Sequence, residues 1–209
     1  MPKTIETFEE GLFEGCKKLL KLEIEDGHPI YESRNSNAII SKVNTTRYYQ
    51  GIGNVNIEAN TLVFGCTGTW IPYSVTAIGP CAFRNNTGIN DIKIPDSITS
   101  IGVYAFSGCT ELYNVDMVSL ESTKTIGNYA FSGCTNLGFH GDTVYTIKIC
   151  GNVGQYAFNG CSNLRLIEFG ENVTTIGNYA FYNCTNLFSR ETTPNATLTI
   201  PETLSSIGV

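Results

Sequence analysis

Eight cysteines and two histidines are the side chains of this 209-residue sequence with the greatest scope for chemistry. Thiolates act as nucleophiles and metal ligands, and imidazole acts as an acid, a base or a ligand. Zinc sites place paired cysteines a few residues apart, and no Cys-x-x-Cys occurs here. The pattern therefore predicts no metal site. Five cysteines share one setting, three residues after a phenylalanine: Cys16, Cys109, Cys134, Cys161 and Cys184.

This cysteine position points to a structural role. In the copy that contains Phe83, the same position holds Asn86. We expect a ladder of buried, reduced thiols. Disulfides between neighbouring copies are the alternative, because a strand spacing of about 4.8 Å lies within the Cα separations that a disulfide tolerates. Cys66, Cys81 and Cys150 lie outside the pattern.

The two histidines offer a weak basis for catalysis. His28 and His140 each lie close to an aspartate, Asp26 and Asp142, in stretches rich in glycine. Histidines in such turns are usually solvated loop residues. The sequence contains no Gly-x-Ser-x-Gly, no phosphate-binding glycine loop and no His-Glu-x-x-His. We expect a protein that is not an enzyme and that has no catalytic residue and no cofactor.

Composition excludes two further classes. The net charge of −6 and the pI near 4.9 argue against a nucleic-acid partner, because that affinity depends on lysine and arginine at phosphates. No apolar run approaches the roughly 18 residues of a membrane span. Residues 1–6 also lack the apolar region of a signal peptide.

The elements that position these side chains follow from a repeat. Successive phenylalanines of a recurring Ala-Phe pair are separated by 23, 25, 27 and 23 residues, and such a period is the signature of a repeat protein. Dividing 209 residues by 23 predicts about nine coils. The pairs are Ala82-Phe83, Ala105-Phe106, Ala130-Phe131, Ala157-Phe158 and Ala180-Phe181.

Each position of the repeat has a physical role. Alternating apolar residues such as Ile92 and Ile94 predict a short strand with one buried face, and Pro95 ends it. The recurrent Ile-Gly, as at Ile101-Gly102, predicts a tight corner in which glycine takes positive φ. Because one such unit cannot bury its apolar side alone, neighbouring units must stack into a solenoid.

The pattern Ile-Pro-x-x-Val-Thr-x-Ile-Gly-x-x-Ala-Phe-x-x-Cys-x-x-Leu resembles the BspA-type leucine-rich repeat of bacterial surface proteins. The resemblance implies a right-handed coil of short β-strands and turns with little helix. We expect a single domain, 1–209, with a divergent first repeat at 1–24. Residues 25–70 form an insertion, and residues 71–209 form regular repeats, the last of them incomplete.

The insertion contains two apolar runs, Ala38–Ile40 and Leu62–Phe64, on either side of a polar stretch with turn residues. This arrangement predicts a β-hairpin near the N-terminus, as the family resemblance also does. Two degenerate coils are the alternative, since Phe13 and Phe83 are 70 residues apart, close to three repeats. Further insertions at 138–145 and 188–196 are expected to bulge as loops at one edge.

Two surfaces are candidates for binding. A tyrosine precedes Ala-Phe in four successive copies, which predicts an aromatic ladder at Tyr104, Tyr129, Tyr156 and Tyr179. Strand positions between buried residues vary from copy to copy and would line a concave face. The expected concave positions are Lys21, Glu23, Asp91, Lys93, Asn114, Asp116, Lys148, Arg165, Glu168 and Thr199.

A rigid frame that displays variable residues suits molecular recognition. We expect a binding scaffold for protein interaction or adhesion, with a host or bacterial surface protein as the partner and glycan as a second ligand class. The resemblance implies an extracellular or cell-surface location. The alternative is a structural spacer or assembly module of a larger surface protein.

Overall fold

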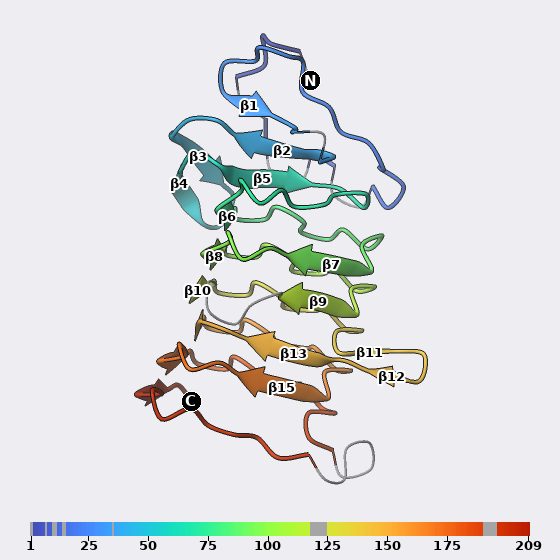
Figure 1. Cartoon of the computed structure of the whole chain (residues 1–209), viewed down its shortest axis with the longest axis vertical. Coiled ribbons are helices and arrows are strands. Elements are labelled where there is room, and N and C mark those ends of the chain that lie inside the picture. The colour runs from blue at the N-terminus through green and yellow to red at the C-terminus, as the bar shows by residue number, and fades with distance from the viewer. Residues whose placement is uncertain are drawn as a thin grey trace.

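The protein is a solenoid whose coils stack along the long axis of the computed structural model, with the two termini at opposite ends (Figure 1). The expected repeat solenoid of short strands and turns is confirmed, and no helix that could span a membrane occurs among the residues described. The structure describes residues 2–6, 8–9, 12–13, 16–34, 36–117, 125–189 and 196–209.

One side of the described stack is a nine-stranded sheet in the order β1-β2-β5-β6-β8-β10-β14-β16-β17. From β5 onward neighbouring strands are parallel, and one buried position pairs from coil to coil, as Ile78 with Ile101 and Ile101 with Ile126. The strands are β1 (Tyr31–Glu32), β2 (Ala38–Ser41), β5 (Thr61–Gly65), β6 (Ala77–Ile78), β8 (Ser100–Ile101), β10 (Thr125–Ile126), β14 (Asn152–Val153), β16 (Thr175–Ile176) and β17 (Ser206–Ile207).

A second side carries four longer strands, β7 (Asp91–Ile94), β9 (Asn114–Met117), β13 (Thr146–Ile149) and β15 (Leu166–Phe169). β7 pairs in parallel with β9 and β13 with β15, while β9 contacts β13. Side chains alternate between the core and solvent along each strand, because successive residues of a strand point to opposite faces.

The third side consists of the Ala-Phe turns. From Phe83 to Phe158, the Phe amide donates a hydrogen bond to the Ala carbonyl of the next coil, as from Phe106 to Ala130 and from Phe131 to Ala157, both at 2.7 Å. The rings stack nearly parallel from Phe83 to Phe181, with centroids 4.8 to 5.3 Å apart, and all but Phe181 are buried. Backbone hydrogen bonds and ring stacking therefore join successive coils where no strand is formed.

The insertion folds differently from the coils. β2 pairs antiparallel with β5, with Ala38 opposite Gly65, whereas successive coils pair in parallel. Within it, β3 (Thr45–Tyr49) and β4 (Gly53–Ile57) form a second antiparallel hairpin. The inserted hairpin is thus present. The estimate of nine coils was wrong, since the stack has about four turns. The strands β1, β2 and β5 pair antiparallel and therefore do not form coils of the repeat.

A further hairpin, β11 (Phe139–His140) with β12 (Thr143–Val144), projects from one edge of the stack at the expected insertion 138–145 (Figure 1). Of the second expected loop, 188–196, residues 190–195 lie outside the described residues.

The glycines of the Ile-Gly pairs do not take positive φ, contrary to our expectation. A Cβ on Gly127 would lie 2.7 Å from the carbonyl carbon of Gly102 and from the amide nitrogen of Val103, and Gly102 is crowded in the same way by the preceding coil. Glycine occupies these positions because the backbones of neighbouring coils approach too closely for any side chain.

Candidate functional site

The recurring cysteines are held by hydrogen bonds between coils. The thiols of Cys109 and Cys134 are fully buried and donate to the carbonyls of Phe83 and Phe106 in the preceding coil, at 3.0 and 3.1 Å. Cys161 and Cys184 repeat this bond. Each thiol thus adds a bond between coils to a carbonyl that already accepts a backbone amide, such as Asn86 to Phe83 and Cys109 to Phe106. All eight cysteines are free, so no disulfide links the coils.

Burial suppresses the reactivity of Cys109 and Cys134. It raises the pKa of Cys109 to about 12 and the pKa of Cys134 well above its ordinary value. The thiols therefore stay protonated at neutral pH, as the bond that they donate requires, and cannot act as nucleophiles. Cys16 departs from the expected ladder because it is exposed, with no coil among the described residues covering its thiol.

His28 is not a solvated loop residue, contrary to our expectation. It is fully buried, and its Nδ1 accepts hydrogen bonds from the amides of Ile30 and Tyr31. Its Nε2 lies 2.9 Å from the carbonyl of Ile5 and donates to it, because Nδ1 already accepts two bonds. His28 thereby ties the N-terminal segment to the inserted strands. His140 belongs to the β11–β12 hairpin and is exposed, and its ring stacks on that of Tyr113.

No group of three or more histidine, cysteine or acidic side chains is arranged to hold a metal ion in the part of the chain that the structure describes. The two histidines also lie on different elements, the turn before β1 and the β11–β12 hairpin. The two histidines of the described chain therefore do not belong to one site.

The four expected tyrosines form a continuous stack. The rings of Tyr104, Tyr129, Tyr156 and Tyr179 have centroids 4.8 to 5.0 Å apart. All four residues have positive φ, between 54° and 57°, so tyrosine occupies the corner conformation that we expected of glycine. Cys81 has the same conformation and precedes Ala82-Phe83, which makes it the equivalent of these tyrosines. Mutual covering of the rings offsets the strain of the corner.

The second candidate surface is the solvent side of β7, β9, β13 and β15, which we call the strand face. The register places Lys93 opposite Asp116 and Lys148 opposite Glu168, so the charges alternate in sign along one column. A second column contains Asp91, Asn114, Thr146 and Leu166. Because opposite charges adjoin, the strand face has no extended field of one sign.

Four of the residues that we expected on the strand face lie elsewhere. Arg165 precedes β15, and its guanidinium lies 3.4 Å above the Phe139 ring of the projecting hairpin. Leu166 occupies the strand-face position that we had expected for Arg165. Thr199 is exposed in 196–200, where no strand is formed. Lys21 and Glu23 form an ion pair of 2.8 Å in a segment that alternates between exposed and buried residues without forming a strand.

The strand face ends in a hollow that our sequence reasoning missed. Its volume is about 470 Å³, and its rim carries two exposed aromatic side chains, Trp70 and Tyr73, which are 53% and 69% exposed. Asp91, Lys93 and Asp116 also line it. A signal was available, because Trp70-Ile71-Pro72 matches Lys93-Ile94-Pro95 of the next copy and thus places Trp70 at an outward position.

Comparison with known proteins agrees with this architecture. The model of the BspA type leucine-rich repeat region matches in six copies over residues 65–187 and 143–209. A search of curated proteins finds no match. A leucine rich cell surface protein from Faecalibacterium prausnitzii is 26% identical with a TM-score of 0.57, and the match covers 76% of this chain and 38% of that protein.

Two more distant structures share the fold. A leucine-rich repeat protein from Eubacterium ventriosum is 20% identical with a TM-score of 0.58, covering all of this chain and 56% of that one. The pneumococcal vaccine antigen PcpA is 16% identical with a TM-score of 0.57, covering 88% of this chain and 44% of that one. The chain thus spans only part of these proteins. By its repeats and its fold, it belongs to the BspA-type leucine-rich repeat family.

Proposed function

We propose that the protein is a non-enzymatic scaffold that binds another protein through the strand face, with Trp70 and Tyr73 as the central contacts. The exposed aromatic pair beside a hollow of about 470 Å³ is the observation that carries this proposal. Tryptophan and tyrosine are enriched among the residues that dominate protein–protein binding energies.

Two properties of the surroundings support a protein ligand. The alternating charges of Lys93, Asp116, Lys148 and Glu168 suit a partner with mixed polar groups rather than a polyanion. The strands that display these residues are fixed by hydrogen bonds and a continuous core, so little entropy is lost on binding. Leucine-rich repeats are typically binding scaffolds without catalytic activity.

The proposal includes adhesion at the bacterial cell surface. It is supported by the Faecalibacterium prausnitzii relative, which is described as a cell surface protein. A host or bacterial surface protein is the proposed partner class, and a glycan that stacks on Trp70 is the competing ligand.

The test is binding to an array of immobilised fibronectin, laminin, collagen and purified host glycans. We expect binding to at least one protein, and we expect the double variant Trp70→Ala/Tyr73→Ala to weaken it at least tenfold. Tyr182→Ala removes an aromatic side chain of similar exposure away from the strand face and serves as the control. Absence of any binding by folded protein, or equal losses in both variants, would contradict the proposal.

An assembly module is the second candidate, because apolar side chains are exposed beyond the last regular coil. Leu198, Ile200 and Ile207 are 40%, 48% and 63% exposed, and β17 is the outermost strand of its sheet. Unpaired strand edges promote association between chains. Light scattering over a range of concentrations tests this function, and a monomer at high concentration would contradict it.

A further inference from the structure

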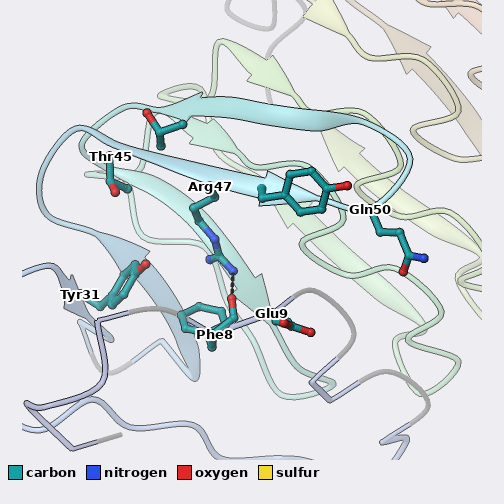
Figure 2. Close-up of a pocket in the computed structure, with 8 residues that line it drawn as sticks. Phe8, Glu9, Tyr31, Thr45, Arg47 and Gln50 are labelled. Atoms are coloured by element: carbon teal, nitrogen blue, oxygen red, sulfur yellow. Dashed lines mark hydrogen bonds between the residues drawn. The ribbon is translucent and has the colours of Figure 1, made fainter.

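A second hollow lies near the N-terminal end of the molecule, between the inserted β3–β4 hairpin and the N-terminal segment. Its volume is about 520 Å³, within the range of about 300–1,000 Å³ that is typical of small-molecule sites. Figure 2 shows Arg47 of β3 pointing toward Phe8, with Tyr31 to one side and Glu9 to the other. The lining residues are Phe8, Glu9, Tyr31, Thr45, Thr46, Arg47, Tyr48 and Gln50.

Arg47 is unusual because its charge is buried and no carboxylate of the described residues is its counter-ion. The side chain is 7% exposed, and no carboxylate among the described residues forms an ion pair with it. One guanidinium nitrogen, Nη2, donates to the carbonyl of Phe8 at 2.7 Å, and the guanidinium carbon lies 4.0 Å from the centre of the Phe8 ring. The other terminal nitrogen, Nη1, is buried and has no hydrogen-bond partner in the described part of the chain.

An unpaired buried charge with an unused donor is costly, and such a group is normally satisfied by an anion or by a neighbouring acceptor. The Arg47 guanidinium therefore favours a hydrogen-bond acceptor that carries negative charge. A carboxylate fits this role because its oxygen accepts a strong, charge-assisted hydrogen bond from a guanidinium N–H.

The remaining lining residues narrow the ligand class. Arg47 is the only cation among them, and Glu9 contributes a negative charge to the same hollow. A singly charged group is therefore favoured over a phosphate dianion or a polyanion. The ring of Tyr31 and the hydroxyls of Thr45 and Thr46 can contact the uncharged body of a ligand.

From this geometry we propose that the hollow binds a single carboxylate carried by a group of amino-acid or monosaccharide size, with Arg47 as the anion ligand. The carboxylate accepts a hydrogen bond from Nη1, and the body of the ligand packs against Phe8 and Tyr31. Because Nη1 is covered, entry requires a small outward movement of the segment that contains Phe8 and Glu9. The C-terminal residue of a peptide and a uronic acid are the two sources of this chemistry.

The test compares matched probes by isothermal titration calorimetry on the whole chain. N-acetylphenylalanine and N-acetylphenylalanine amide differ only in the carboxylate, as do glucuronic acid and glucuronamide. We expect at least one carboxylate to bind at least tenfold more tightly than its amide, and the better pair identifies the source. Equal affinity within both pairs, or inorganic phosphate binding as tightly as the carboxylates, would overturn the proposal.

Variants test the role of Arg47 independently. Arg47→Met is expected to weaken binding of the carboxylate at least tenfold, and Arg47→Lys to restore part of the loss. Arg84→Met is the matched control, because Arg84 also lies over an aromatic ring, Tyr104, but outside the hollow. Unchanged affinity in folded Arg47→Met would contradict the assignment. If this variant fails to fold, the acid and amide pairs on the unaltered protein still decide.

The strand face provides a separate control. Trp70→Ala lies outside the lining of the Arg47 hollow and is expected to leave carboxylate affinity unchanged. Loss of protein binding and loss of carboxylate binding are thus distinguishable, and failure of either proposal leaves the other standing.

Discussion

At the scale of single residues, the repeat is stabilised by polar atoms that bond to the neighbouring coil. The thiols of Cys109, Cys134, Cys161 and Cys184 each donate to a phenylalanine carbonyl of the preceding coil, as Cys134 does to Phe106. In the first regular copy Asn86 replaces cysteine, and its side-chain oxygen Oδ1 accepts from the hydroxyl of Thr67, 19 residues earlier, and from the amide of Gly88. The position thus selects a small polar side chain.

The buried thiols predict a loss of stability in alkali. The ordinary thiol pKa of 9.0 is raised in folded Cys109 to about 12. Between these values the unfolded chain loses the proton and the folded chain keeps it, so the free energy of unfolding falls as pH rises. A shift of one pKa unit corresponds to about 1.4 kcal/mol, so the contribution of this thiol is roughly 2 kcal/mol at pH 10.5.

Urea denaturation under reducing conditions at pH 7.5 and about 10.5 measures this effect. Cys109→Ser keeps a hydroxyl donor but removes the thiol, so its free energy of unfolding is expected to fall less than that of the unaltered protein. Cys16→Ser changes an exposed thiol and should leave the pH dependence unaltered. Identical pH dependence in Cys109→Ser and the unaltered protein would refute the explanation.

At the scale of elements, a coil has two kinds of special backbone position. Gly127 fills one because the backbone of the preceding coil leaves no room for a Cβ. Gly133 fills the other because its φ is 76°, while a Cβ there would meet nothing nearer than 3.7 Å. The first position therefore excludes any side chain, whereas the second requires only a left-handed backbone and is filled by Asn85 and Asn183 in other copies.

Alanine substitutions separate these two constraints. Gly127→Ala forces two backbones apart, and we expect a loss of about 3 kcal/mol in the free energy of unfolding. Gly133→Ala introduces only left-handed strain, and we expect a loss of about 1 kcal/mol. Chemical denaturation of both variants gives the comparison. A larger loss for Gly133→Ala would show that coil spacing is not the limiting contact.

The periodic part of these elements could be predicted from the sequence, because residues that recur at one spacing must form ladders in a stack. The stacked rings of Phe106 and Phe131 follow directly from that rule. The conformation of Tyr129 does not, since nothing in a residue's type announces positive φ in tyrosine. His28 was misjudged because its burial depends on Ile5, 23 residues away.

The candidate sites were less predictable than the fold. Arg165 was assigned to the strand face from its place in the repeat, but its contact with Phe139 depends on an insertion that the repeat does not specify. Arg47 gave no sequence signal at all, because its hollow forms where the β3–β4 hairpin meets the N-terminal segment. Arg165 and Arg47 thus both make their contacts where the chain departs from the repeat.

At the scale of the whole molecule, the core is a row of layers rather than a sphere. The larger apolar cluster runs through the regular coils, and a second cluster lies under the inserted strands and includes Ile39, Val63 and Leu22. Each layer contacts its neighbours, so stability is expected to be local along the stack.

A cavity in one layer should therefore open that layer and its neighbours first. Phe131→Leu reduces a fully buried ring that stacks on Phe106 and Phe158, and the amides of Phe106 and Phe131 donate across the same layers. By hydrogen exchange with mass spectrometry we expect amides in 105–109 and 130–134 to lose protection, while 38–41 in the inserted strands retains it. Equal loss of protection along the whole chain would show instead that the solenoid and the insertion unfold as one cooperative unit.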